Sequence, residues 1–62
     1  MHNLRTLIVD DEPLAIERLQ ILASQLDGVS LVGTASDGPS ALRMVEALSP
    51  DVLLCDIAMP GL

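Results

Sequence analysis

Apolar residues gather in three short segments that predict β-strands at residues 5–9, 29–35 and 52–55. The first and third segments are apolar runs of the kind that buried parallel strands show. The first run ends at Val9 and three acidic residues follow at once, as expected where a strand leaves the core for a loop. The third run has no charge, no proline and no polar alternation, which is typical of a strand covered on both faces.

Between these strands, two segments show the three- and four-residue spacing of an amphipathic helix. The first helix is predicted at residues 13–26 and the second at residues 39–48. Each begins with a proline, which suits the first helical turn because no N–H is needed there. The apolar stripe of the first helix consists of Ala15, Ile16, Leu19, Leu22, Ala23 and Leu26.

The order strand, helix, strand, helix, strand, with short connections, predicts an α/β fold built on a parallel sheet. Crossovers between parallel strands are right-handed, so a strand order of 2-1-3 puts the two helices on opposite faces in a three-layer βαβαβ unit. Ligands of such sheets bind at the carboxyl ends of the strands, where the strand order reverses. The sequence places Asp10, Asp11 and Asp56 at that edge.

Three carboxylates that meet in one crevice repel one another, so their ionised forms need a cation. A hard oxygen set with positions left for water favours Mg²⁺. An aspartate is also a competent nucleophile toward phosphorus when a metal neutralises the charge on the transferred oxygens. The pattern therefore predicts a Mg²⁺ site at Asp10, Asp11 and Asp56, with Asp56 as the phosphoryl acceptor.

Composition argues against several other functions. Nine acidic and three basic residues give a net charge of −6, which disfavours contact between this segment and nucleic acid. No apolar run approaches the roughly 20 residues that cross a bilayer. A single cysteine and the lack of a signal-peptide pattern at the N-terminus favour a cytoplasmic protein.

The acidic pair and the third strand together resemble the receiver domains of two-component response regulators. Most of the resemblance lies in Pro50-Asp51-Val52-Leu53-Leu54-Cys55-Asp56-Ile57-Ala58-Met59-Pro60-Gly61. It implies a flavodoxin-like fold in which Asp56 accepts phosphoryl from the phosphohistidine of a histidine kinase. It further implies that Asp10, Asp11 and Asp56 hold Mg²⁺ with the backbone carbonyl of Ala58, in a signalling module and not a turnover enzyme.

Receiver domains run to about twice this length, so the resemblance makes residues 1–62 the N-terminal part of one. The Ser/Thr and Lys that contact the phosphoryl group in the family are expected in the other half, and phosphotransfer without them is expected to be inefficient. The run from Asp10 to Ala15 also resembles receivers attached to LytTR-type DNA-binding domains. The parent protein is therefore expected to carry a DNA-binding output domain that regulates transcription.

Two alternative functions remain open at this point. One is a self-associating pseudo-receiver that is not phosphorylated, because the Lys and Ser/Thr are missing. The other is a haloacid-dehalogenase-type phosphatase, although Ala58 stands where its acid–base aspartate normally lies.

The position of the third strand in the sheet predicts a homodimer. In the order 2-1-3 this uncharged strand is an edge, so a second copy is expected to pair along it.

The remaining polar residues are assigned structural roles. Cys55 is predicted to be a small buried residue, and His2 to lie in a frayed terminus. Three aspartates beside Gly or Pro predict turns and caps, and three scattered arginines predict solvated charges. These are Asp27, Asp37, Asp51, Arg5, Arg18 and Arg43.

Overall fold

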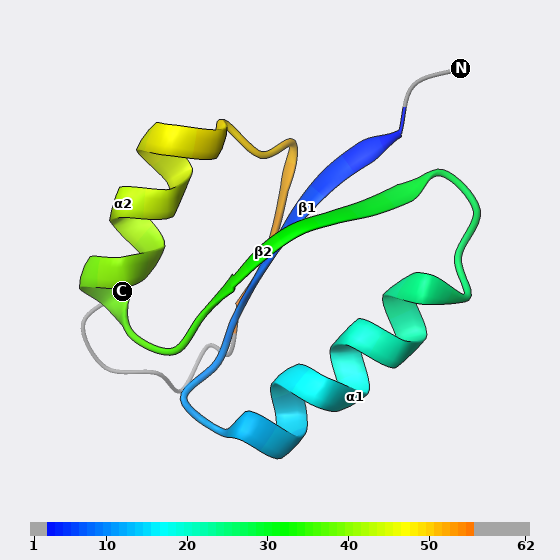
Figure 1. Ribbon diagram of the computed structural model, residues 1–62, viewed down its shortest axis with the longest axis horizontal. Helices are drawn as coiled ribbons and strands as arrows, with labels where there is room; N and C mark the ends of the chain where they lie inside the picture. The colour runs from blue at the N-terminus through cyan, green and yellow to red at the C-terminus, as the bar shows by residue number, and fades with distance from the viewer. Residues whose placement is uncertain (1–2, 56–62) are drawn as a thin grey trace.

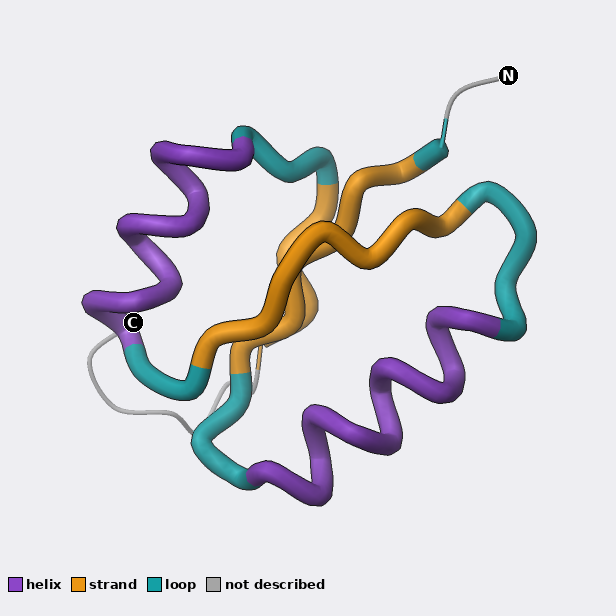
Figure 2. Tube along the Cα trace, viewed as in Figure 1, coloured by secondary structure: helices purple, strands orange, loops and turns teal. Residues whose placement is uncertain are grey.

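The computed structural model describes residues 3–55. The elements are β1 (Leu4–Val9), α1 (Pro13–Ser24), β2 (Val29–Ala35), α2 (Gly38–Leu48) and β3 (Val52–Cys55). The strands are parallel in the order β2-β1-β3, and the two helices lie on opposite faces of the sheet (Figure 1, Figure 2). The predicted architecture and strand order are confirmed. Within these residues, neither helix has the length and apolar character needed to cross a membrane.

β1 forms the centre of the sheet because its apolar side chains are covered on both faces. Leu7, Ile8 and Val9 are all 0% exposed. Successive side chains of a strand point to opposite faces, so this run serves both layers. Leu7 and Val9 cluster with Ala35 and Ala41 on the face that carries α2. Full burial contributes about 1.5–3 kcal/mol for each of these large aliphatic side chains.

Helix α1 is shorter and less buried than its sequence predicts. The N–H groups of Gln25 and Leu26 donate to the carbonyls of Leu22 and Ala23 at 3.1 and 3.2 Å. These bonds span three residues instead of four, which tightens the last turn, so the helix ends at Ser24 and not at Leu26. Only Ala23 of the predicted apolar stripe is fully buried, and Leu22 is 56% exposed. Among the described elements, α1 packs on β1 and β2 but not on β3.

Two other elements begin one residue earlier than predicted. Helix α2 begins at Gly38 because Asp37 caps it, with Oδ1 of Asp37 accepting a 2.7 Å hydrogen bond from the N–H of Ser40. Such a cap supplies a partner for a donor that the first helical turn would otherwise leave unpaired. Strand β1 begins at Leu4, whose N–H donates to the carbonyl of Gly28 at 2.6 Å.

The two edges of the sheet differ. On the β2 side, the register with β1 shifts between Thr6 and Leu7, so that Val32 has no partner on β1. Both helices also pack on β2. On the other side, β3 pairs with β1 without a shift, and neither helix packs closely on it within the described residues. Within the described residues Leu53 and Leu54 are 45% and 37% exposed, which agrees with the prediction that the third strand is an edge in the order β2-β1-β3.

Candidate functional site

Asp10 lies at the carboxyl end of the central strand and is only 7% exposed. Its N–H donates to the carbonyl of Ala35 at 3.0 Å, which holds the residue beside the end of β2. Its Oδ1 accepts a 2.9 Å hydrogen bond from the N–H of Glu12. This bond between a side chain and the backbone two residues later stabilises the acidic turn, residues 10–12. The carboxylate is therefore buried and fixed in orientation by the fold alone.

The strands that lead to Asp10 and Asp56 end side by side. Val9 is the register partner of Cys55, and Cys55 packs against the core cluster on the α2 face. Cys55 is half-buried there, not fully buried as predicted. Asp11 is exposed in the bend between β1 and α1. The structure thus brings two of the predicted residues to the edge of the sheet at which the third strand ends.

The other predicted site residues, Asp56 and Ala58, lie outside the described residues, as does His2. Within residues 3–55, no three His, Cys, Asp or Glu side chains lie close enough together to hold a metal ion. The predicted set needs Asp56 in addition to Asp10 and Asp11. The two described members fit a hard divalent cation, because both offer carboxylate oxygens and one of them is buried and already oriented.

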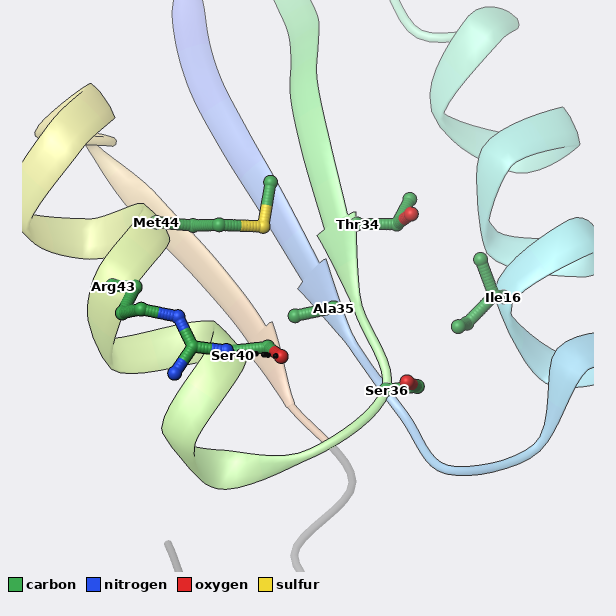
Figure 3. Close-up of a pocket in the computed structure, with 7 residues that line it drawn as sticks. All are labelled: Ile16, Thr34, Ala35, Ser36, Ser40, Arg43 and Met44. Atoms are coloured by element: carbon green, nitrogen blue, oxygen red, sulfur yellow. Dashed lines mark hydrogen bonds between the residues drawn. The ribbon is translucent and has the colours of Figure 1, made fainter.

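A cavity of about 340 Å³ lies elsewhere, beside the carboxyl end of β2 and between the two helices (Figure 3). Its polar lining consists of Thr34, Ser36, Ser40 and Arg43, and Nη2 of Arg43 donates to Oγ of Ser40 at 3.1 Å. None of the predicted site residues lines it. Sequence reasoning missed this cavity because hydroxyl groups and one arginine at these spacings match no recognisable motif.

Two charged residues outside the acidic turn, Asp37 and Arg5, have structural partners. The backbone N–H of Ser40, and after it the Ser40 hydroxyl, lowers the pKa of Asp37, because both hydrogen bonds favour the ionised carboxylate. Arg5 was predicted to be a solvated charge, but its Nη1 donates to the carbonyl of Ser49 at 3.0 Å. Its backbone N–H donates to Oδ2 of Asp51 at 2.9 Å. Arg5 therefore helps to join the amino ends of β1 and β3.

Residues 6–62 match the response regulator receiver domain family, and the chain belongs to that family. It is 53% identical over 60 residues to the positive alginate biosynthesis regulatory protein of Pseudomonas aeruginosa, covering 95% of this chain and 24% of that protein. It is 47% identical over 57 residues to the transcriptional regulatory protein BtsR of Salmonella typhi, covering 92% and 24%. The signal receiver domain of the response regulator NarL from Mycobacterium tuberculosis matches with a TM-score of 0.90 and 39% identity, over 100% of this chain and 50% of that one.

Family membership defines the chain as a receiver module of two-component signalling, which is regulatory and not enzymatic. The phosphatase alternative is therefore wrong, and the pseudo-receiver alternative finds no support in these similarities. The chain spans about a quarter of the length of these curated relatives and half of the matched receiver structure.

Proposed function

We propose that this chain is the phosphoacceptor part of a response regulator and that Asp56 is the residue that receives the phosphoryl group. The observation that carries the proposal is the buried, oriented carboxylate of Asp10 at the end of β1. That carboxylate lies beside the end of the strand that leads to Asp56, because Val9 and Cys55 are register partners. Membership of the receiver family supports the same assignment.

The proposed cation is Mg²⁺, held by the carboxylates of Asp10, Asp11 and Asp56 and by the backbone carbonyl of Ala58. Mg²⁺ bound there would neutralise charge on the phosphoryl oxygens during transfer. The hydrogen bond from Glu12 to Oδ1 of Asp10 orients this ligand, as outer hydrogen bonds commonly do at metal sites. Asp11 is exposed, so its side chain is free to adjust to the ion.

The proposed phosphodonor is the phosphohistidine of a histidine kinase. An oxygen of the Asp56 carboxylate would form a bond to phosphorus while the phosphorus–nitrogen bond breaks and its electron pair stays on the imidazole. An ionised carboxylate needs no general base for this attack. The role of the fold is to place that oxygen at the carboxyl ends of the strands, next to acidic residues whose charge the proposed Mg²⁺ would neutralise.

We place residues 1–62 in the N-terminal part of a receiver domain, within a cytoplasmic protein that carries a DNA-binding output domain. The names of the relatives, which are regulatory and transcriptional proteins, support such an output. The LytTR type of output domain rests on the run from Asp10 to Ala15 alone. With a net charge of −6, this segment is proposed to leave DNA contact to the output domain.

Phosphoryl labelling tests the proposal. Acetyl phosphate and Mg²⁺ supply the donor and the ion, and borohydride trapping followed by mass spectrometry locates the acyl phosphate. We expect labelling of Asp56 in the full-length parent and much weaker labelling in the 62-residue chain, because groups that stabilise the transferring charge are expected beyond residue 62.

The matched variants are Asp56→Asn, which should abolish labelling, and Asp27→Asn, which should not change it. Asp27 lies in the turn before β2, at the opposite edge of the sheet from the acidic turn. Labelling that persists in Asp56→Asn, or equal labelling rates for the chain and its parent, contradicts the proposal.

A further inference from the structure

The cavity of about 340 Å³ beside the carboxyl end of β2 combines an apolar wall with a small set of polar groups. Its walls come from α1, from α2 and from the strand that lies between them (Figure 3). The apolar residues are Ile16, Ala35 and Met44, and the polar residues are Thr34, Ser36, Ser40 and Arg43. A concave surface of this size and composition is the usual form of a site for a small molecule.

The cavity lies on the side of the sheet away from β3. β2 is the outer strand in the order β2-β1-β3, and every lining residue falls between residues 16 and 44. The same elements are arranged alike in the longer receiver domain to which the chain was matched. The described elements therefore form the walls of this cavity by themselves.

The apolar wall is held in place by the core. A Cβ atom at Gly33 would collide with Cε of Met44, so the lack of a side chain at Gly33 lets Met44 lie across β2. Ala35 is two residues further along the strand and points to the same face, where it is 5% exposed. Both Ala35 and Met44 pack in the core cluster on the α2 face. This wall is therefore formed before any ligand binds.

The charge of the cavity is opposite in sign to that of the chain. Arg43 is the only charged residue in the lining, whereas the chain has a net charge of −6. Nη2 of Arg43 donates to Oγ of Ser40 at 3.1 Å, and Arg43 forms no ion pair within residues 3–55. The carboxylate of Asp37 accepts from the N–H of Ser40 and does not line the cavity. The lining thus favours a ligand with negative charge.

We propose that this cavity binds a small molecule in which an oxyanion, either phosphate or carboxylate, is joined to a compact apolar group. The guanidinium of Arg43 presents N–H groups in a planar fork that matches two oxygens of such an anion. The Ser40 hydroxyl accepts from Arg43 and still has its own hydrogen to donate to the oxyanion. The apolar group would lie against Met44 and Ala35. The proposal is independent of the phosphoacceptor role, because none of the residues assigned to that role lines the cavity.

Calorimetric titration of the full-length parent with phenyl phosphate tests the proposal. Divalent cations are left out, so that the acidic turn repels anions and does not bind them through a metal. We expect saturable binding at one site, about fivefold or more tighter than that of inorganic phosphate, because the ring buries apolar surface. Benzoate is titrated in the same way, and the tighter of the two ligands shows whether the site prefers phosphate or carboxylate.

Two variants that remove the same charge locate the binding site. Arg43→Gln should weaken the binding of phenyl phosphate about tenfold or more, because it removes the charged donor. Arg18→Gln should change the affinity less than about twofold, since Arg18 is exposed on α1 and does not line the cavity. Arg43→Lys keeps the charge without the fork and should bind with an intermediate affinity. Circular dichroism checks that each variant is folded.

Three results would overturn the proposal. The first is that neither phenyl phosphate nor benzoate shows saturable binding. The second is an equal loss of affinity in Arg43→Gln and Arg18→Gln, which would mean that the anion responds only to the total charge of the protein. The third is inorganic phosphate that binds as tightly as phenyl phosphate, because the apolar wall would then have no part in binding.

Discussion

Asp10 and Asp37 accept similar hydrogen bonds but differ in burial, and this difference distinguishes a candidate metal ligand from a helix cap. Asp10 and Asp37 each accept a hydrogen bond from a backbone N–H two or three residues further along. Asp10 is nearly buried at the edge of the sheet, whereas Asp37 is exposed at the start of α2. A buried carboxylate is costly unless its charge is balanced, which is a physical reason to assign a cation to Asp10. The cap alone explains Asp37.

Asp37→Ala should lower the melting temperature at neutral pH, because it removes the cap of α2. The folded chain lowers the pKa of Asp37, so the contribution of Asp37 to stability is present above its ordinary pKa of about 4. It is lost as the pH falls through the folded-state pKa. Thermal unfolding followed by circular dichroism should show a clear difference at pH 7 that narrows toward zero in acid. A difference that does not change with pH would count against the cap.

At the scale of the elements, the end of α2 carries local backbone strain. Ser49 ends the helix with φ 47° and ψ 59°, in the left-handed region that glycine adopts without a steric penalty. Ser49→Gly should therefore raise the free energy of unfolding by about 0.5–1 kcal/mol, while the carbonyl that accepts from Arg5 is retained. Urea denaturation measures the change. Ser24→Gly, at a residue with helical backbone, should instead lower stability, and a shift in the same direction for both variants would contradict this account.

The strand order could be predicted because short connections and right-handed crossovers leave few topologies for this pattern of elements. The end of α1 could not, because it depends on the three-residue hydrogen bonds made by Gln25 and Leu26. The surroundings of β3 could not be predicted either. The apolar residues Leu53 and Leu54 predict that the strand is buried, but they do not predict which element packs against it.

For the candidate site, the sequence predicts where the acidic residues lie but not how they are oriented. Acidic residues at the end of an apolar strand locate Asp10 and Asp11 at the carboxyl edge of the sheet, and the structure places them there. The hydrogen bond from Glu12 that orients Asp10 is a detail of turn geometry that spacing does not specify. The cavity between α1 and α2 arises from residues on three elements, and no local pattern marks it.

At the scale of the whole molecule, the parallel sheet separates two kinds of surface. Its carboxyl edge collects acidic residues beside the end of β3, and its outer side leaves the apolar side chains of β3 exposed. The first surface is where we propose that a cation and a phosphoryl group bind. Both follow from the order β2-β1-β3, which among the described strands makes β1 the central one and places β3 beside it.

Calorimetric titration of Mg²⁺ into the chain is the most direct test of the central claim, that Asp10, Asp11 and Asp56 form one cation site. We expect weak binding, because part of the family's site is expected beyond residue 62. Asp11→Asn and Asp56→Asn should each reduce the affinity about tenfold or more, whereas Asp27→Asn, in the turn before β2, should leave it unchanged. If both site variants bind Mg²⁺ as tightly as the unsubstituted chain, the three carboxylates do not share a site and the assignment is contradicted.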